Sequence, residues 1–102
     1  MKRVVLTDGS GSWFDAEAAE SFSEETRWNG NNHISKATGS QWEHEALYRT
    51  KGGLWILNHY SQQGDAETYA IITNSEAAAW LVTNDYEPHT DCKSEYAALE
   101  LV

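Results

Sequence analysis

Three strand-like runs joined by short loops constrain the fold of this chain more than any other feature of its sequence. The runs are QWEHEALYRT (41–50), LWILNHYS (54–61) and AETYAIIT (66–73), and all three contain the β-branched or aromatic residues typical of strands. They are separated by Lys51-Gly52-Gly53 and by residues 62–65. Loops of this length join antiparallel neighbours. The sequence therefore predicts a three-stranded antiparallel meander in the middle of the chain.

The segment before the meander predicts shorter elements. Arg3–Thr7 is rich in β-branched side chains, which indicates a strand. Asp15 can act as an N-cap for the alanine-rich residues that follow, which predicts a short helix from about Ala16 to Ser23. Asn29-Gly30 is a strong turn dipeptide, and it is expected to join two short strands, around Arg27-Trp28 and around His33-Ile34.

Helical patterns follow the meander. Asn74 is the expected N-cap of a helix whose apolar residues Ala77, Trp80 and Leu81 fall on helical spacing, and Asn84 marks its end before Pro88. The tail predicts a second short helix with Tyr96, Leu99 and Val102 turned inward. Together these elements predict one α+β domain over residues 1–102, with an antiparallel sheet of three to five strands and two or three helices packed on one face.

Charge and cysteine content narrow the classes of partner and compartment. The chain has 16 acidic and 7 basic residues, a net charge of −9, and one cysteine, Cys92. Such a surface repels nucleic acid and anionic membranes, and no basic patch offsets it. The apolar run near the N-terminus is three residues long, and nothing approaches the ~20 apolar residues of a membrane span. A soluble cytoplasmic protein without nucleic-acid or membrane partners is therefore expected.

The first strand of the meander carries a mixture of polar and aromatic side chains. Alternation places one set on one face and a second set on the opposite face. The first set is Trp42, His44, Ala46 and Tyr48, and the second is Glu43, Glu45, Leu47 and Arg49. The adjacent letters EHE are thus not a local metal site, because the strand itself separates His44 from both glutamates.

What lies opposite these residues depends on the turn, and two registers are open. A two-residue Gly52-Gly53 loop makes His44 and His59 diagonal neighbours, which suits a transition metal. A three-residue loop with Gly53 as a bulge places Glu45 opposite His59 and His44 opposite Tyr60, which suits an acid–base pair. A shift of one residue turns a whole strand over relative to its partner, and both loops are ordinary.

The aromatic residues of the three runs are the strongest hint of function. More large rings fall on these strands than one helical layer can cover, and exposed aromatic patches usually mark interfaces. The expected contact residues are Trp42, Tyr48, Trp55 and Tyr60, with His44 and His59 as polar anchors. A non-catalytic binding module is predicted, homodimeric through this sheet face and contacting a protein or a small ligand. No cofactor is implied.

Two other functions are compatible with the sequence. Acidic residues gather in one short segment, which suits an antitoxin-like or DNA-mimicking partner of a basic protein; they are Asp15, Glu17, Glu20, Glu24 and Glu25. An enzyme or metal site could instead use Glu43, Glu45, His44 and His59, and Glu43, Glu45 and His59 are the candidate catalytic residues. No nucleophile, P-loop or zinc-finger pattern accompanies them, so catalysis is the less favoured interpretation.

Three stretches carry a resemblance to known sequences: TDGSGSWFD, ISKATGSQWEHEALYRT and EAAAWLVTNDYEP. They resemble small uncharacterised bacterial proteins of the kind carried on plasmids and mobile gene cassettes. The similarity runs through most of the chain. It implies a bacterial cytoplasmic protein and assigns no activity and no functional residues.

Overall fold

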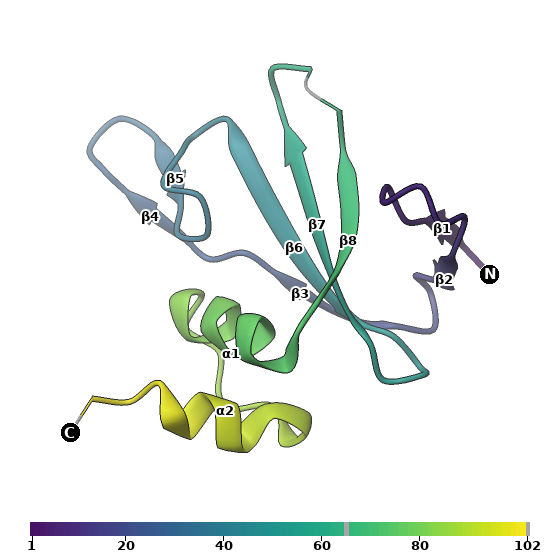
Figure 1. The fold of residues 1–102 in the computed structure, drawn as a ribbon. Helices are drawn as coiled ribbons and strands as arrows, with labels where there is room; N and C mark the ends of the chain where they lie inside the picture. The colour runs from purple at the N-terminus through teal and green to yellow at the C-terminus, as the bar shows by residue number, and fades with distance from the viewer. Residues whose placement is uncertain (65, 102) are drawn as a thin grey trace.

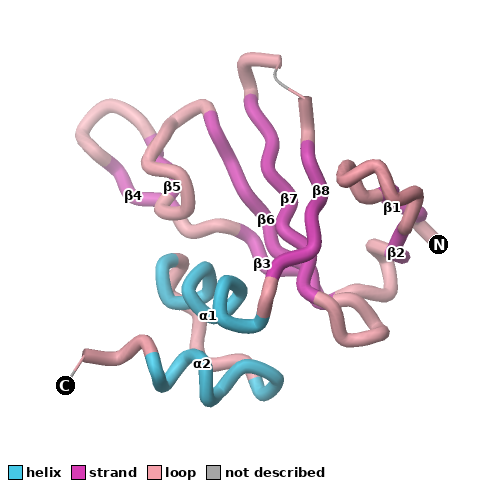
Figure 2. The backbone as a smooth tube through the Cα atoms, in the orientation of Figure 1, coloured by secondary structure: helices cyan, strands magenta, loops and turns pink. Residues whose placement is uncertain are grey.

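The computed structural model describes residues 1–64 and 66–101, and over these residues the chain has an α+β fold with antiparallel sheets, as predicted (Figures 1 and 2). The strands are β1 (Arg3–Val5), β2 (Trp13–Asp15), β3 (Glu20–Ser23), β4 (Thr26–Trp28), β5 (His33–Ser35), β6 (Glu43–Arg49), β7 (Trp55–Ser61) and β8 (Thr68–Ile72). The helices are α1 (Asn74–Thr83), the 3-10 turn η1 (Thr90–Cys92) and α2 (Lys93–Ala98). The described strands outnumber the three to five expected, because β1–β2 and β4–β5 form separate two-stranded sheets.

The main sheet has the strand order β3-β6-β7-β8, and β6-β7-β8 is the predicted meander. Its central hairpin takes the second of the two registers, with Glu45 opposite His59 and Arg49 opposite Trp55. The Thr50 amide donates to the Leu54 carbonyl at 2.8 Å, and Gly53 adopts a φ of 92°, a conformation that glycine tolerates best. The β7–β8 loop includes residue 65, which lies outside the described residues.

One face of the main sheet packs against the helices. Alternation turns Leu47 and Trp55 toward α1, where they form a core with Ala77, Ala78 and Leu81. The helix begins one residue earlier than expected: Thr73 is the N-cap, and it forms a capping box with Glu76 while Asn74 is the first helical residue. Asn84 ends the helix as predicted, and its side-chain amide donates to the Trp80 carbonyl.

The β1–β2 hairpin covers half of the opposite face. Leu6 and Phe14 from this hairpin bury Ile56, and the Phe14 ring lies 5.4 Å from the Tyr48 ring. The Thr7 amide donates to the Tyr69 carbonyl and fastens the hairpin to the edge of β8 (Figure 1). The covered half is the one near the β6–β7 turn, so the half near the β7–β8 loop stays open.

The helix expected from about Ala16 to Ser23 is wrong. Asp15 accepts hydrogen bonds from the backbone amides of Lys2 and Glu17, and the alanines that follow form a turn. Glu20–Ser23 is strand β3, paired with β6 so that Phe22 lies opposite Leu47. Burial of Phe22 beside the main core thus outweighs the helix propensity of the short alanine run.

The other local predictions are largely confirmed. Strands β4 and β5 pair across the turn at Asn29, whose side-chain oxygen accepts hydrogen bonds from two loop amides. In α2, Tyr96 packs inward and its hydroxyl donates to the Tyr86 carbonyl. Leu99 does not turn inward as expected: it is the C-cap of α2 and is about half exposed. Val102 lies outside the described residues. No described helix has the length and hydropathy needed to cross a membrane.

Candidate functional site

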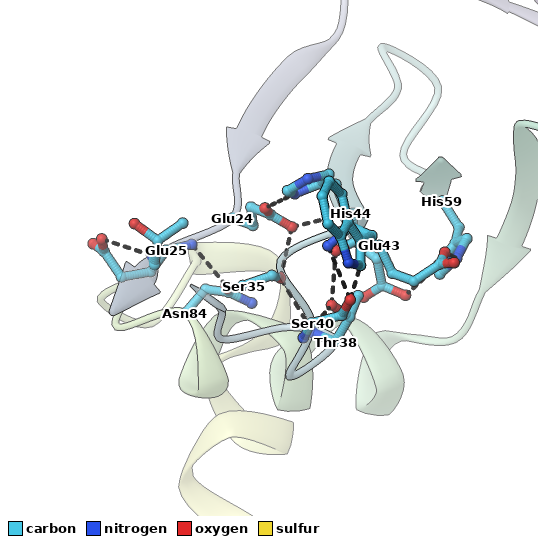
Figure 3. A network of polar contacts seen from close by, with 12 residues as sticks. Glu24, Glu25, Ser35, Thr38, Ser40, Glu43, His44, His59 and Asn84 are labelled. Carbon is cyan, nitrogen blue, oxygen red and sulfur yellow. Dashed lines mark hydrogen bonds and ion pairs between the residues drawn. The ribbon is translucent and has the colours of Figure 1, made fainter. Parts of the chain in front are cut away.

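Strand β6 carries two different polar clusters, one on each face of the main sheet. His44 pairs with Glu24 on the face that β1–β2 partly covers, whereas Glu43 and Glu45 contact His59 on the face that packs against α1. Figure 3 shows both clusters around the same strand. Alternation alone separates them, as the sequence predicted.

Glu24 lies directly after β3, where that strand leaves the sheet. One of its carboxylate oxygens accepts hydrogen bonds from the Glu45 amide at 2.7 Å and from the Ser35 hydroxyl at 2.8 Å. The other lies 2.6 Å from Nδ1 of His44 (Figure 3). The Glu24 side chain is only 10% exposed. A carboxylate therefore occupies the edge of β6 that β3 no longer pairs, and it satisfies a strand amide there.

The loop between β5 and β6 is held by its own hydroxyl groups. The Thr38 hydroxyl donates to the Glu43 carbonyl at 2.8 Å, and the Ser40 hydroxyl oxygen accepts from the Glu43 amide at 3.2 Å (Figure 3). The same network reaches the end of α1, because the Glu25 amide donates to the Asn84 side-chain oxygen at 2.8 Å. These contacts, together with the packing of Ala37 against the main core, position His44 at the start of β6.

The His44 ring has one free nitrogen. Because a carboxylate oxygen only accepts hydrogen bonds, Nδ1 carries the proton that faces Glu24. Nε2 is buried and has no hydrogen-bond partner among the described residues. In the neutral ring it is an acceptor without a donor. The ring stacks on Tyr60 with centroids 5.4 Å apart.

His59 has no free nitrogen. Its Nε2 lies 2.7 Å from Glu43 and its Nδ1 lies 3.3 Å from Glu45. Glu45 is held in turn by the Trp80 indole, which donates to it at 3.1 Å. Burial of the ring opposes protonation, but the hydrogen bonds and charges of the two glutamates outweigh it and raise the pKa of His59 above 6.5. This arrangement favours the protonated ring, in which both nitrogens donate to carboxylates.

The predicted Glu45–His59 pair is present, but both nitrogens of its imidazole contact carboxylates. An acid–base residue needs a nitrogen that can reach a substrate, and both nitrogens of His59 are engaged. Metal ligands must converge on one point, whereas Glu43 and Glu45 lie at opposite sides of the imidazole. Within residues 1–64 and 66–101, no group of three or more His, Cys, Asp or Glu side chains is placed to hold a metal ion.

Of the four predicted aromatic contact residues, one is buried, one is half-buried and two are exposed. Trp55 is 1% exposed and belongs to the core, with the Arg49 guanidinium 4.7 Å above its ring. Tyr48 is half-buried under Phe14. Trp42 and Tyr60 are 44% and 37% exposed, and only these two can offer much ring surface to a partner.

Trp42, His44, Tyr60 and Glu67 form what we call the Tyr60 patch, on the open half of the sheet. The Gln62 amide donates to the Trp42 carbonyl, which extends the β6–β7 ladder and places Trp42 on the same face as His44. Glu67 accepts hydrogen bonds from the buried Asn58 side chain at 3.0 Å and from the Tyr69 hydroxyl at 2.9 Å. Partial burial, followed by the negative charges of Glu24 and Glu67, raises the pKa of Tyr60 above 10.

Sequence reasoning missed two acidic residues here: Glu67, which belongs to the Tyr60 patch, and Glu24, which is buried beneath it and pairs with His44. Glu24 was predicted only as part of an acidic segment, and Glu67 was not singled out. Asn58 could have indicated Glu67, because an amide in the middle of an apolar strand needs a buried hydrogen-bond partner.

Comparisons with protein-family models, with curated proteins and with solved structures found no match to this chain. The resemblance to small bacterial plasmid and cassette proteins stays a prediction.

Proposed function

We propose that this protein is a non-catalytic binding module that recognises a cationic segment of a partner protein through the Tyr60 patch. The supporting observation is that exposed ring surface and negative charge coincide there. Tyr60 has one ring face against His44 and remains 37% exposed, while Glu24 and Glu67 act on its hydroxyl. Lysine and arginine bind aromatic faces through cation–π attraction, and nearby carboxylates strengthen the local negative field.

Charge also bears on the predicted homodimer. A symmetric dimer through the Tyr60 patch would place Glu67 of each copy near the same acidic surface of the other. Each chain carries a net charge of −9, so this contact is opposed by like-charge repulsion. A basic partner meets the same surface with favourable charge. The antitoxin-like alternative and the binding-module hypothesis thus converge on one type of partner.

The polar clusters support a binding role better than a catalytic one. The free nitrogen of His44 is buried beside Tyr60, and both nitrogens of His59 are bound to carboxylates. Neither imidazole offers an accessible nitrogen for proton transfer to a substrate. Their hydrogen bonds instead hold β6 and β7 in place, which keeps the exposed rings in a defined position.

Titration with a synthetic peptide of alternating arginine and glycine, followed by NMR, tests this proposal. We expect the Tyr60 ring and Trp42 indole signals to shift, and the affinity to fall with added salt. Tyr60→Leu should weaken binding about tenfold, the scale of one cation–π contact. Trp28→Leu is the matched control, because Trp28 is an exposed ring on β4, outside the patch.

Two results would contradict the proposal. One is a peptide that shifts no signal of the Tyr60 patch, and the other is an equal loss of affinity in the Tyr60 and Trp28 variants. Sedimentation of the free protein, with and without Tyr60→Leu, separates the alternatives. If the free protein is a dimer and Tyr60→Leu dissociates it, the Tyr60 patch binds a second copy of the chain and not a basic partner.

A further inference from the structure

The turn between β4 and β5 contains a motif that the Tyr60 patch does not use, Asn29-Gly30. Asn29 is the only asparagine in the sequence that directly precedes a glycine. Residues 29–32 are all exposed. The β4–β5 hairpin forms a two-stranded sheet of its own that extends away from the main sheet (Figure 1). Solvent therefore reaches this turn.

An asparagine before a glycine can react with the backbone of its own neighbour. The backbone nitrogen of the second residue lies near Cγ of the asparagine, and a side chain on the second residue would hinder their approach. Glycine has no such side chain. Gly30 adopts a φ of 103°, and no atom of the described residues lies within 4 Å of the position that a Cβ would take. The space beside the Gly30 backbone is thus open.

Two backbone amides hold the side-chain carbonyl of Asn29. Its Oδ1 accepts hydrogen bonds from the Asn31 amide at 2.9 Å and from the Asn32 amide at 2.8 Å. This oxygen takes up negative charge when a nucleophile adds to Cγ. Donors that already point at such an oxygen stabilise the tetrahedral intermediate, as in an oxyanion hole. The same hydrogen bonds fix the orientation of the side chain, which lowers the entropic cost of ring closure.

We propose that Asn29 is a site of spontaneous covalent modification, where asparagine is converted through a cyclic imide to aspartate and isoaspartate. The Gly30 nitrogen loses its proton and forms a bond to Cγ of Asn29, and the bond from Cγ to Nδ2 breaks and releases ammonia. Water then opens the ring. Hydrolysis at Cγ gives aspartate, and hydrolysis at the backbone carbonyl carbon gives isoaspartate. Water is the only co-reactant, and nothing is oxidised or reduced.

The conversion should be selective for Asn29. The remaining asparagines all precede a residue with a side chain, and they are Asn31, Asn32, Asn58, Asn74 and Asn84. Asn58 and Asn84 are also buried. Asn31 and Asn32 are exposed in the same turn as Asn29. These two differ from Asn29 chiefly in the residue that follows, so they are internal controls.

The modification should change the hairpin and leave the main sheet intact. Isoaspartate adds one atom to the backbone and a negative charge. The Asn29 amide donates to the Asn32 carbonyl at 3.1 Å, and the Trp28 ring lies 5.1 Å from the His33 ring. A longer backbone displaces these partners, and Trp28 is 61% exposed. The modified chain therefore presents Trp28 differently, whether or not the Tyr60 patch binds a cation.

Mass spectrometry of the full chain tests this proposal. Trypsin cleaves after Arg27 and Lys36, and the resulting peptide contains Asn29 and both internal controls. After incubation at neutral pH, we expect Asn29 to convert about tenfold faster than Asn31 or Asn32, because glycine leaves the attacking nitrogen unhindered. A sample digested without incubation gives the baseline. Equal rates at the three positions, or no conversion, would overturn the proposal.

Two comparisons separate the roles of the glycine and of the turn. Gly30→Ala should slow the conversion of Asn29 about tenfold, because its Cβ hinders the attack. A synthetic peptide of residues 28–36 has the same sequence without the folded turn. We expect the full chain to convert at least as fast as this peptide, because its amides stabilise the intermediate. Slower conversion in the full chain would show that the turn protects Asn29 and would refute the proposal.

NMR of the ageing protein tests the effect on the hairpin. A second Trp28 indole signal should grow in proportion to the isoaspartate measured by mass spectrometry. The Trp55 indole is the matched control, because Trp55 is 1% exposed in the main core. A single, unchanged Trp28 signal in the modified chain would contradict the expected displacement. A new Trp55 signal would show that the change is not confined to the hairpin.

Discussion

His44 and His59 both pair with glutamate, but the two pairs differ in burial and in the parts of the chain that they connect. Each lies on the central hairpin, and each is paired with glutamate. His44 is largely buried, its partner Glu24 comes from a distant loop, and one ring nitrogen is free. His59 is more than a third exposed, its partners lie on the neighbouring strand, and both nitrogens are engaged. One pair joins separate parts of the chain, whereas the other ties two strands that are already paired.

A histidine–carboxylate pair contributes most to stability where it is buried. Removing one member of a buried pair leaves a charge or an amide without a partner, and that cost is large. Removing an exposed pair lets water take over its hydrogen bonds, so the cost is small. The two histidine pairs should therefore respond differently to mutation and to pH, and three measurements test this expectation.

The largest effect is expected for Glu24→Ala. This substitution removes the acceptor for the Glu45 amide, the Ser35 hydroxyl and His44 at once. The free energy of unfolding should fall by about 3 kcal/mol, as for other broken buried pairs. Urea denaturation measures it. Glu25→Ala, at the exposed neighbouring position, should change stability by no more than about 0.5 kcal/mol. Equal effects at the two positions would remove the special role of Glu24.

A smaller effect is expected for Trp80→Phe. The indole of Trp80 is buried and donates to Glu45, which in turn holds His59. Losing this hydrogen bond and some ring volume should cost about 1–2 kcal/mol in the same urea assay. Trp42→Phe is the matched control, because the Trp42 indole is exposed and its side chain makes no hydrogen bond among the described residues. If Trp80→Phe leaves the free energy of unfolding unchanged, Glu45 does not depend on the hydrogen bond from Trp80.

The smallest effect is expected for the pH dependence of the His59 bridge. Glu43 and Glu45 raise the pKa of His59 above 6.5 despite its partial burial. The stabilisation is therefore complete below the unfolded-state pKa of about 6.5, and it is lost as pH rises through the folded-state pKa. Since the pair is exposed, it should contribute less than about 1 kcal/mol. NMR titration of His59 gives its pKa. Unfolding at pH 6 and pH 8 should differ less in His59→Gln, and an unchanged difference would exclude His59 as its source.

Much of this fold could be predicted because its signals are local. Short loops define the meander, helical spacing of Trp80 and Leu81 defines α1, and Asn29-Gly30 defines the β4–β5 turn. Strand β3 could not be predicted in this way. Its pairing with β6 joins residues more than 20 positions apart, and the nearby alanines favour a helix when considered alone.

The candidate site was predictable in part. Alternation correctly separated His44 from Glu43 and Glu45, and the second register correctly predicted that Glu45 faces His59. The choice between the registers depends on how the side chains of the whole sheet pack, because both turns are common. The Glu24–His44 pair was out of reach, since it depends on where β3 ends and on a hydroxyl-rich loop that brings Ser35 to Glu24.

The carboxylate at the edge of β6 has a consequence for isotope exchange. The amide proton of Glu45 is held by a side chain and not by a neighbouring strand. Its protection from deuterium in solvent therefore reports whether Glu24 is in place, independently of the rest of the ladder. The exchange rate of this single amide therefore measures local opening where β3, the β5–β6 loop and β6 meet, while the surrounding sheet stays intact.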